Sequence, residues 1–376
     1  MKKVGYGLFA LIYYLCCIVP RKKNKVFCIM THDASDSSNV GVVVKALQQK
    51  GGYYFHMLRK DERDQVTKQG KLLGMLSFFF LKPYHMATAS YILQDNVFLP
   101  MAYIRFPKSV KVVQLWHGTG TIKKFGQSVN EGELGELEKA ADQTITHLIV
   151  NGKATREIYK EAFGVEDSNV YELGLPRTDI LFHEESCNQL KQEFYGKYPE
   201  LKGKRLVLYA PTFRDQEVTN PKLAFDLEAL VQSLPEDMYL GLKLHPFVAR
   251  SFTGIELPKQ LKDKVYDLSF ETDTNQLLIV ADILITDYSS IIFEYCVLRK
   301  PMLFYAYDYD EFKQHQRGFY EDYESFVPGD IVYTQKELME RLNTDCYDLS
   351  RIDEFIQEQY RYLDGRATER LLKVVF

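Results

Sequence analysis

The stretch from Asp282 to Tyr305 constrains the fold more than any other part of the sequence. A short apolar run, Ile283 to Ile285, leads through a polar segment into apolar residues at helical spacing. A second apolar run, Met302 to Tyr305, follows directly after Lys300-Pro301. Strand, polar turn, helix and strand in this order predict a βαβ unit with two parallel strands. A chain that contains such a unit is expected to build an α/β sheet.

The polar turn of this unit predicts a phosphate site. Ser289 and Ser290 fall where the N-cap and first turn of the helix are expected. Free backbone N–H groups and the positive end of the helix dipole would then point at a ligand above the sheet. Glu294 follows about one turn later, in a position to accept from a sugar hydroxyl. An ordinary capped crossover helix explains the same pattern without a ligand.

Strand, polar loop and helix also alternate along the rest of the chain. A chain of 376 residues exceeds what one hydrophobic core usually serves. Gly and Pro interrupt the pattern near residues 175–185, after which it restarts, so we expect two α/β domains, 25–178 and 179–348. Helical patterns in 349–376 are expected to pack back across the junction. The predicted strands are 25–30, 53–58, 87–93, 110–115, 146–150, 170–173, 205–210, 238–244, 265–268, 283–285 and 302–305.

Polar residues follow several of these strands. Trp116, His117, Gly118 and Thr119 come directly after the strand 110–115. Ligands of α/β sheets bind outside the carboxyl ends of the strands, and a histidine delivered there before two glycines suits a general base. A lone histidine is more often structural or exposed, but this one is preceded by the only Trp of the chain and followed by a basic loop.

Three strand ends of the second half carry side chains suited to anionic phosphate. The three segments begin at Pro211, at Lys243 and at Thr286. Parallel strands place these segments on one rim of the sheet, where together they predict a phosphate-binding site. The candidate binding residues are Thr212, Arg214, Lys243, His245, Thr286, Asp287, Ser289, Ser290 and Glu294.

Composition limits the ligands and the cellular compartment that we expect for this chain. The net charge of −4 gives no indication of a nucleic-acid partner. Six cysteines lack metal-ligand spacing and are expected to be reduced thiols, which places the chain on the cytoplasmic side. The motif segments contain no paired-carboxylate cluster, so they require no metal, although Mg²⁺ remains an option. The 26 Tyr and 24 Phe suit sugar binding or a membrane interface.

The first residues differ from the rest of the chain. An apolar run from Val4 to Val19 would span about 24 Å as a helix, less than the roughly 30 Å of a bilayer core. We expect residues 1–24 to form an interfacial anchor, with Arg21, Lys22, Lys23 and Lys25 facing anionic headgroups. A signal peptide and a buried first helix are the alternatives. The segment from Phe78 to Tyr84 is either a second membrane contact or core.

Several of these segments resemble the CDP-glycerol glycerophosphotransferase family, whose members build wall teichoic acids and related chains. The similar segments occur in the family's order over essentially the whole chain after the anchor. They are Trp116-His117-Gly118-Thr119, Ala210-Pro211-Thr212-Phe213-Arg214, Lys243-Leu244-His245-Pro246, Thr286-Asp287-Tyr288-Ser289-Ser290, Phe293-Glu294 and Lys300-Pro301.

The resemblance implies a GT-B-like fold, two Rossmann-like domains facing a cleft, with an acceptor domain followed by a CDP-donor domain. It implies transfer of glycerol phosphate from CDP-glycerol to an undecaprenyl-diphosphate-linked acceptor, with release of CMP, at the cytoplasmic face of the membrane. His117 would take the proton of the acceptor hydroxyl, beside Trp116, Gly118 and Thr119. His245 and Arg214 would hold the diphosphate with the Ser289 and Ser290 amides, and Glu294 would bind the ribose.

Motifs shared by the whole family leave several alternatives open. Priming of the lipid-linked disaccharide is the first expectation, while polymerisation, transfer of ribitol phosphate and a capsular acceptor are the others. A more distant alternative is a GT-B glycosyltransferase or epimerase that uses a UDP-sugar. A membrane-tethered binding protein with a decayed site is opposed by the presence of both His117 and His245.

Overall fold

The computed structural model describes residues 2–60, 72–214, 223–245, 248–249, 262–315, 318–344 and 346–376. The chain divides into two compact units. Unit 1 comprises Met1–Thr119, Lys124–Asp179 and Gln359–Phe376, and unit 2 comprises Gly120–Lys123 and Ile180–Glu358. Pro246, part of one motif segment, lies outside the described residues.

Unit 1 is built on a six-stranded sheet in which every strand pair is parallel, with the order β2-β1-β3-β4-β5-β6. The strands are β1 (Lys22–Met30), β2 (Tyr54–Arg59), β3 (Ala89–Gln94), β4 (Lys111–Gln114), β5 (His147–Val150) and β6 (Val170–Glu172). The helices of this unit with at least six residues are α1 (Lys2–Cys16), α2 (Asn39–Lys50), α5 (Lys82–Ala87), α6 (Gly132–Asp142), α7 (Lys153–Phe163) and α18 (Ala367–Val375).

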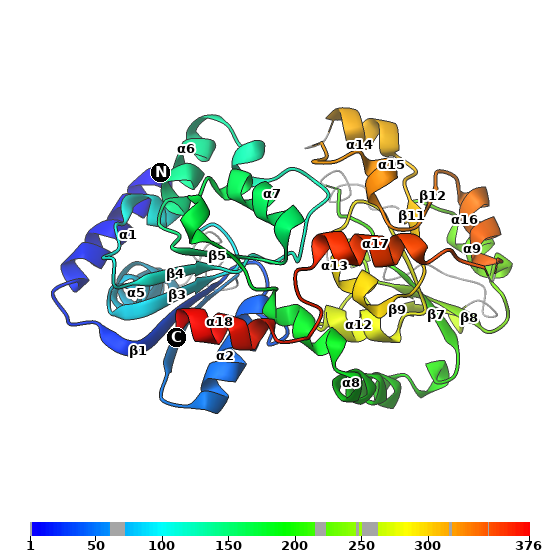
Figure 1. Ribbon diagram of the computed structural model, residues 1–376, viewed down its shortest axis with the longest axis horizontal. Helices are drawn as coiled ribbons and strands as arrows, with labels where there is room; N and C mark the ends of the chain where they lie inside the picture. Colours follow the sequence, from blue (N-terminus) through cyan, green and yellow to red (C-terminus); the bar gives the residue numbers. More distant parts are fainter. Residues whose placement is uncertain are drawn as a thin grey trace. The chain divides into compact units, whose positions relative to one another are not determined.

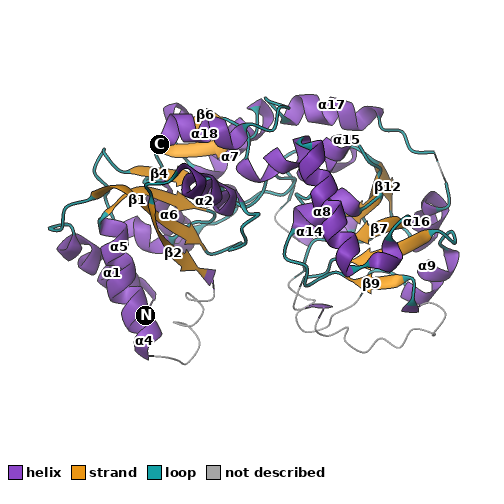
Figure 2. Ribbon diagram, turned by 90° about the horizontal axis from the view of Figure 1, so that it is seen from below, coloured by secondary structure: helices purple, strands orange, loops and turns teal. Residues whose placement is uncertain are grey.

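The alternating side chains of β1 separate the two faces of this sheet. Phe27 and Ile29 are buried with residues of α1 and α5, whereas Cys28 is buried with residues of α2 and α18. Figure 2 shows α1 and α5 on one side of the sheet and α2 and α18 on the other. Both faces are therefore covered by helices, which is the arrangement that a fully parallel sheet requires.

Unit 2 contains a second parallel sheet, with the order β12-β11-β10-β7-β8-β9. Its strands are β7 (Arg205–Tyr209), β8 (Met238–Leu242), β9 (Val265–Asp267), β10 (Ile283–Thr286), β11 (Met302–Tyr305) and β12 (Asp330–Val332). The α-helices in the described part of this unit are α8 (Glu184–Lys197), α9 (Leu227–Ser233), α12 (Thr274–Val280), α13 (Ile292–Tyr295), α14 (Tyr309–His315), α15 (Tyr323–Phe326), α16 (Gln335–Leu342) and α17 (Ser350–Gln359).

The prediction of two parallel-sheet α/β domains is confirmed, and each predicted strand is present with ends shifted by a few residues. Strand β12 and helices α6, α9, α12, α14 and α15 were not predicted. The C-terminal segment divides between the units, because Glu358 closes unit 2 and Gln359 opens the last part of unit 1. Helix α18, red in Figure 1, lies beside α2 and buries Leu371 and Val375 in the same core cluster.

The N-terminal helix packs into unit 1, and the expected membrane association of residues 1–24 stays a prediction. Phe9, Ala10 and Tyr13 of α1 are buried in the core with Phe27, because one face of the helix covers the sheet. Strand β1 already begins at Lys22, so the expected boundary falls inside a strand. Within the described residues, no helix has the length and apolar character needed to cross a bilayer.

Candidate functional site

The order of the strands places one candidate site in each unit. A doubly wound sheet binds ligands where the strand order reverses, outside the carboxyl ends of the strands. In unit 1 the reversal lies between β1 and β3, and the segment that carries His117 follows the neighbouring β4. In unit 2 it lies between β7 and β10, which end just before Thr212 and Asp287.

A strained turn delivers His117. Trp116 has a φ of 54°, a left-handed conformation that is unusual for a bulky residue. The turn is held from both sides, since the Trp116 N–H donates to Oε1 of buried Gln114 at 2.9 Å and Nδ2 of Asn39 donates to the Trp116 carbonyl at 3.1 Å. The Trp116 ring is stacked on Phe125, with centroids 5.0 Å apart. These contacts explain why a costly conformation persists there.

The following carbonyl groups are also fixed. Nη1 of Arg177 donates to the His117 carbonyl at 2.9 Å, and the hydroxyl of buried Tyr159 donates to the Gly118 carbonyl at 3.0 Å. Thr119 is fully buried, and its expected place beside the acceptor stays a prediction. We interpret Gly118 and Thr119 as the rigid support of His117.

The tautomer of His117 follows from its hydrogen bond. Its Nδ1 lies 2.9 Å from the backbone carbonyl of Asp95, and a carbonyl only accepts, so Nδ1 carries the proton. Nε2 is then the basic nitrogen. The side chain of Asp95 accepts from the N–H groups of Thr31, His32 and Asp33, which fixes the neighbouring loop. Asp95 thus fixes the His117 ring through its backbone carbonyl and the loop 31–33 through its carboxylate.

A second histidine keeps His117 neutral. The rings of His32 and His117 are stacked with centroids 3.6 Å apart. Burial and the adjacent His32 lower the pKa of His117 well below its usual value, because a cation there would lose water and face a second imidazole. Burial raises the pKa of Asp95 to about 6, although its backbone hydrogen bonds oppose that shift. At neutral pH the unit therefore presents an uncharged imidazole with a fixed basic nitrogen.

In unit 2, Arg214 forms the centre of a buried network. Its Nε and Nη2 donate to the two carboxylate oxygens of Asp308, and its Nη1 donates to Asp287 and to the Thr212 carbonyl. Aromatic rings surround the guanidinium at 5.4 to 5.5 Å, from Tyr288, Tyr307 and Phe312. The guanidinium therefore joins two carboxylates within the fold, while its expected contact with the donor diphosphate stays a prediction.

Three further candidates have structural hydrogen bonds instead of open positions. The hydroxyl of Thr286 donates to the Ala210 carbonyl at 2.7 Å, joining β10 to the end of β7. Oδ1 of buried Asp287 accepts from the Thr212 N–H at 2.7 Å. Nζ of Lys243 donates to the carbonyls of Ser269 and Glu271. These hydrogen bonds hold the loops at the rim, while the expected contacts of Thr286, Asp287 and Lys243 with the nucleotide donor stay predictions.

The helix at the expected phosphate cradle is shorter than the sequence predicts, and phosphate binding there stays a prediction. Helix α13 contains only four residues, Ile292–Tyr295, so it supplies little helix dipole. Ser289 and Ser290 precede it in a turn, where Oγ of Ser289 accepts from the Ile291 N–H at 3.4 Å. Glu294 is buried within α13, and its expected contact with a ribose stays a prediction.

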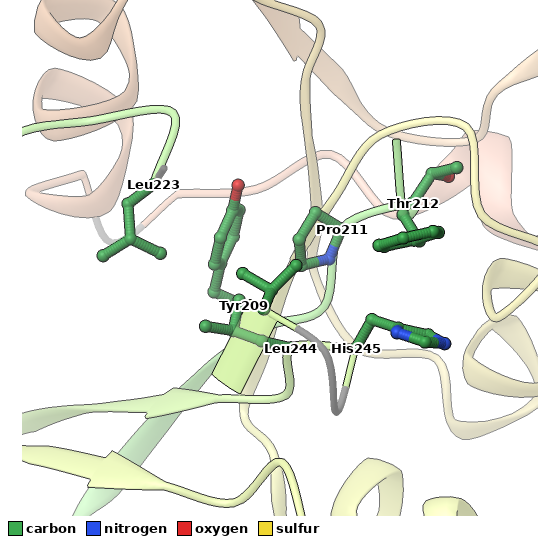
Figure 3. A pocket seen from close by; sticks show the side chains of 8 residues that line it. Tyr209, Pro211, Thr212, Leu223, Leu244 and His245 are labelled. Carbon is green, nitrogen blue, oxygen red and sulfur yellow. The ribbon is translucent and has the colours of Figure 1, made fainter. Parts of the chain in front are cut away.

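His245 and Thr212 remain at an open position. They line a small pocket at the ends of β7 and β8, with Thr212 and His245 on one side and Leu223 on the other (Figure 3). The ring of Phe213 lies against that of His245, with centroids 4.3 Å apart. Nζ of Lys123 donates to the Thr212 hydroxyl at 3.4 Å and brings a cation to this pocket. The other residues that line the pocket are Tyr209, Pro211, Leu244 and Val248.

Sequence reasoning missed several residues around both sites. His32 and Asp95 follow β1 and β3, so the strand-end rule that identified His117 would also have found them. Asp308 follows β11 in the same way, but its pairing with Arg214 depends on folding. Lys123 appeared only as part of a basic loop. The described part of the chain contains no group of three or more His, Cys, Asp or Glu side chains arranged to hold a metal ion.

Comparison with known proteins identifies the family of the chain. The chain matches the CDP-Glycerol:Poly(glycerophosphate) glycerophosphotransferase family over residues 11–376. It is 33% identical to the teichoic acid poly(ribitol-phosphate) polymerase of Bacillus spizizenii over 100% of this chain, and it spans 60% of the length of that relative. It is 30% identical to the teichoic acid glycerol-phosphate primase of Bacillus subtilis, over 98% of this chain and 96% of that protein.

The fold is similar to the solved structure of the wall teichoic acid polymerase TagF. The TM-score is 0.78 at 20% sequence identity, and the match covers 99% of this chain and 93% of that one. Family match, relatives and fold agree, and the chain belongs to the CDP-glycerol:poly(glycerophosphate) glycerophosphotransferase family.

Proposed function

We propose that this chain transfers glycerol phosphate from CDP-glycerol to a hydroxyl of an undecaprenyl-diphosphate-linked acceptor, with release of CMP, as a priming transferase of teichoic acid synthesis. The observation that carries the proposal is the fixed, neutral imidazole of His117, with Nδ1 bonded to the Asp95 carbonyl and Nε2 left as the base. Family membership supplies the class of donor.

His117 acts on the acceptor. Its Nε2 removes the hydroxyl proton as the oxygen forms a bond to the glycerol-bearing phosphorus of CDP-glycerol. The bond between that phosphorus and the bridging oxygen breaks, and CMP leaves with the electron pair. General-base assistance of this kind typically contributes about 10²- to 10⁴-fold to the rate. Because the pKa of His117 is lowered, the protonated ring releases its proton to solvent readily.

The pocket of unit 2 serves the nucleotide donor. His245 is placed beside Thr212, and Lys123 adds a positive charge at the same pocket. Phosphoryl transfer depends mainly on alignment and on neutralising charge that develops on oxygen. We assign His245 to the diphosphate, where it steadies charge on the leaving CMP. Arg214, Asp287, Thr286 and Lys243 hold the loops that form this pocket.

The test is a transfer assay with purified protein and a lipid-linked disaccharide acceptor. CDP-glycerol, CDP-ribitol and a UDP-sugar are supplied separately, with Mg²⁺ or with EDTA, and free nucleotide and extended lipid are measured. We expect CMP and a lipid extended by a single glycerol phosphate from CDP-glycerol. Release of UDP, or no transfer from either CDP-polyol, would contradict the proposal.

Polymerisation of ribitol phosphate is the second candidate. The sequence is 33% identical to a relative named as a poly(ribitol-phosphate) polymerase, slightly more than to the glycerol-phosphate primase. In the same assay this alternative gives preferential consumption of CDP-ribitol. Its product is a ladder of lipids that lengthens with the ratio of donor to acceptor.

A further inference from the structure

The loop that follows the first strand of unit 1 forms an anion-binding nest. After β1, the backbone N–H groups of Thr31, His32 and Asp33 all donate to the side chain of Asp95, at 3.0, 3.2 and 2.9 Å. Successive N–H groups arranged in this way bind phosphate in many proteins. Here they lie at the reversal of the strand order, where α/β sheets bind their ligands.

The protein itself supplies the anion for this nest. Asp95 follows β3, the strand next to β1, and only 1% of the residue is exposed. Both carboxylate oxygens accept hydrogen bonds, Oδ1 from Thr31 and Oδ2 from His32 and Asp33. An external phosphate would therefore have to displace a buried carboxylate or lie against its negative charge.

The start of α2, where a phosphate could also bind, is closed by the same loop. Oγ of Ser38 accepts from the Gly41 N–H at 3.1 Å and donates to the Ser35 carbonyl at 2.7 Å. A Cβ on Gly41 would lie 2.3 Å from the oxygen of that carbonyl, so the loop lies directly against the helix. Oδ1 of Asp33 accepts from the Ser35 N–H at 2.9 Å. These amides therefore already have acceptors within the chain.

Unit 2 has a counterpart of Asp95 in different surroundings. Asp287 follows β10, which lies next to β7, and it accepts from the Thr212 N–H in the loop after β7. Arg214, in the same loop, donates to Asp287 and so matches its charge. Thr212 also lines the pocket that contains His245. In unit 2 this loop is therefore open to a ligand, whereas the amides of the loop in unit 1 bind a carboxylate.

We propose that Asp95 is a specificity residue: its carboxylate fills the phosphate nest of unit 1, excludes the phosphates of a nucleotide, and reserves His117 for an uncharged hydroxyl. The identity of the two substrates, CDP-glycerol and the acceptor, rests on the proposed function. His117 lies beside the nest, because its ring is stacked on that of His32 and its Nδ1 bonds to the Asp95 carbonyl. A nucleotide phosphate in the nest would therefore occupy the surroundings of the base.

The first measurement is calorimetric titration of the purified full chain with inorganic phosphate. Saturating CMP is present, so that the proposed donor pocket of unit 2 is already filled. Asp95→Ala removes the internal anion, and Asp36→Ala, at an exposed aspartate of the same loop, is the matched control. Thermal unfolding confirms that each variant is folded. Asp95→Ser, which keeps one acceptor for the amides, replaces the alanine variant if that one does not fold.

We expect Asp95→Ala to bind one more phosphate per chain than the parent, about tenfold or more tightly, because phosphate gains the charge-assisted hydrogen bonds that the carboxylate made. The Asp36→Ala control should bind phosphate as the parent does. A folded Asp95 variant with the phosphate binding of the parent would overturn the proposal. Failure of CMP to bind to the parent would contradict the proposed donor pocket, but not the additional phosphate site of the variant.

The second measurement uses the parent alone, so it does not depend on the folding of a variant. In the transfer assay, CMP should compete with CDP-glycerol and not with the acceptor, because the nest of unit 1 excludes it. Competition of CMP with the acceptor in the parent would reveal a nucleotide site in unit 1 and overturn the proposal. In the Asp95→Ala variant we expect CMP to inhibit competitively against both substrates.

Discussion

The guanidinium of Arg214 donates to both carboxylate oxygens of Asp308, each at 3.0 Å, across 94 residues of sequence. Asp308 follows β11 and Arg214 follows β7, while Asp287, the second partner, follows β10. Three strand ends at the reversal of the second sheet are therefore joined by a single cation. The hydroxyl of Tyr288 also donates to Asp308, at 3.1 Å.

This network predicts that Arg214 acts on stability first. Arg214→Lys keeps the charge but cannot bridge two carboxylates with a planar fork, so we expect a loss of about 1–3 kcal/mol in the free energy of unfolding. Arg205→Lys, at a half-exposed arginine paired with Asp237, is the control and should change it by less than about 1 kcal/mol. Thermal unfolding measures both. Unchanged stability together with lost CDP-glycerol binding would return Arg214 to the role of a ligand.

The sequence predicts those parts of the candidate site that depend only on the position of a residue after a strand. Alternating strands and helices, and the rule that ligands bind at carboxyl ends of strands, lead to His117 and His245 directly. The sequence does not reveal which polar side chains satisfy each other after folding. Arg214, Lys243 and Thr286 have the right chemistry for a phosphate, yet their donors bond to Asp308, to backbone carbonyls and to neighbouring strands.

The sequence also does not reveal which side of the first helix is buried. Its apolar run predicts burial or membrane contact, but periodicity is uninformative when every side of a helix is apolar. Only the packed structure separates the core side, with Phe9 and Tyr13, from the outer side, with Leu11 and Leu15. At α13 the helical spacing was correct, but the α-helix ends after four residues and continues as a 3₁₀ turn, Cys296–Leu298.

Substitution of His117 and substitution of His245 are predicted to have different effects on CDP-glycerol affinity and turnover. His117→Ala should leave the affinity for CDP-glycerol near that of the parent and lower turnover by about a hundredfold or more, because a base matters when the acceptor loses its proton. His245→Ala should lower turnover and weaken binding of CDP-glycerol, since its contact exists before and during transfer. Calorimetric titration and the transfer assay separate the two. The opposite pattern would exchange their roles.

As the pH is lowered, protonation of Asp95 is predicted to reduce the rate before protonation of His117 does. The pKa of Asp95 is raised to about 6, so below that pH its carboxylate is protonated and holds the Thr31 and Asp33 amides less firmly. The pKa of His117 lies well below 6.5, so its own protonation affects the rate only at lower pH. Asp95→Asn should lower the rate and abolish the step near pH 6. A step that persists in this variant and disappears in His117→Asn would assign it to the histidine.

Asp142 is predicted to reduce stability as the pH rises. Burial raises the pKa of this carboxyl to about 8, with Gln127 Nε2 donating to it at 3.0 Å. Between about pH 4 and pH 8 the folded state binds more protons than the unfolded state, so the free energy of unfolding falls with increasing pH. Asp142→Asn mimics the neutral acid and should remove this dependence. Melting curves of parent and variant should converge below about pH 4 and separate, with the variant more stable, near pH 9.

The two sides of α1 give the last prediction. Phe9→Ala removes a fully buried ring that contacts Phe78 and Phe98, and large-to-small changes of this kind cost about 3–5 kcal/mol. Leu11→Ala changes an exposed position two residues away and should alter the free energy of unfolding by less than about 0.5 kcal/mol. Deletion of residues 1–24 removes this core side together with the first residues of β1, so it should destabilise unit 1 and not merely release the chain from lipid. Thermal unfolding without lipid decides the matter. A deletion variant with the melting temperature of the parent would show that α1 does not stabilise the core of unit 1.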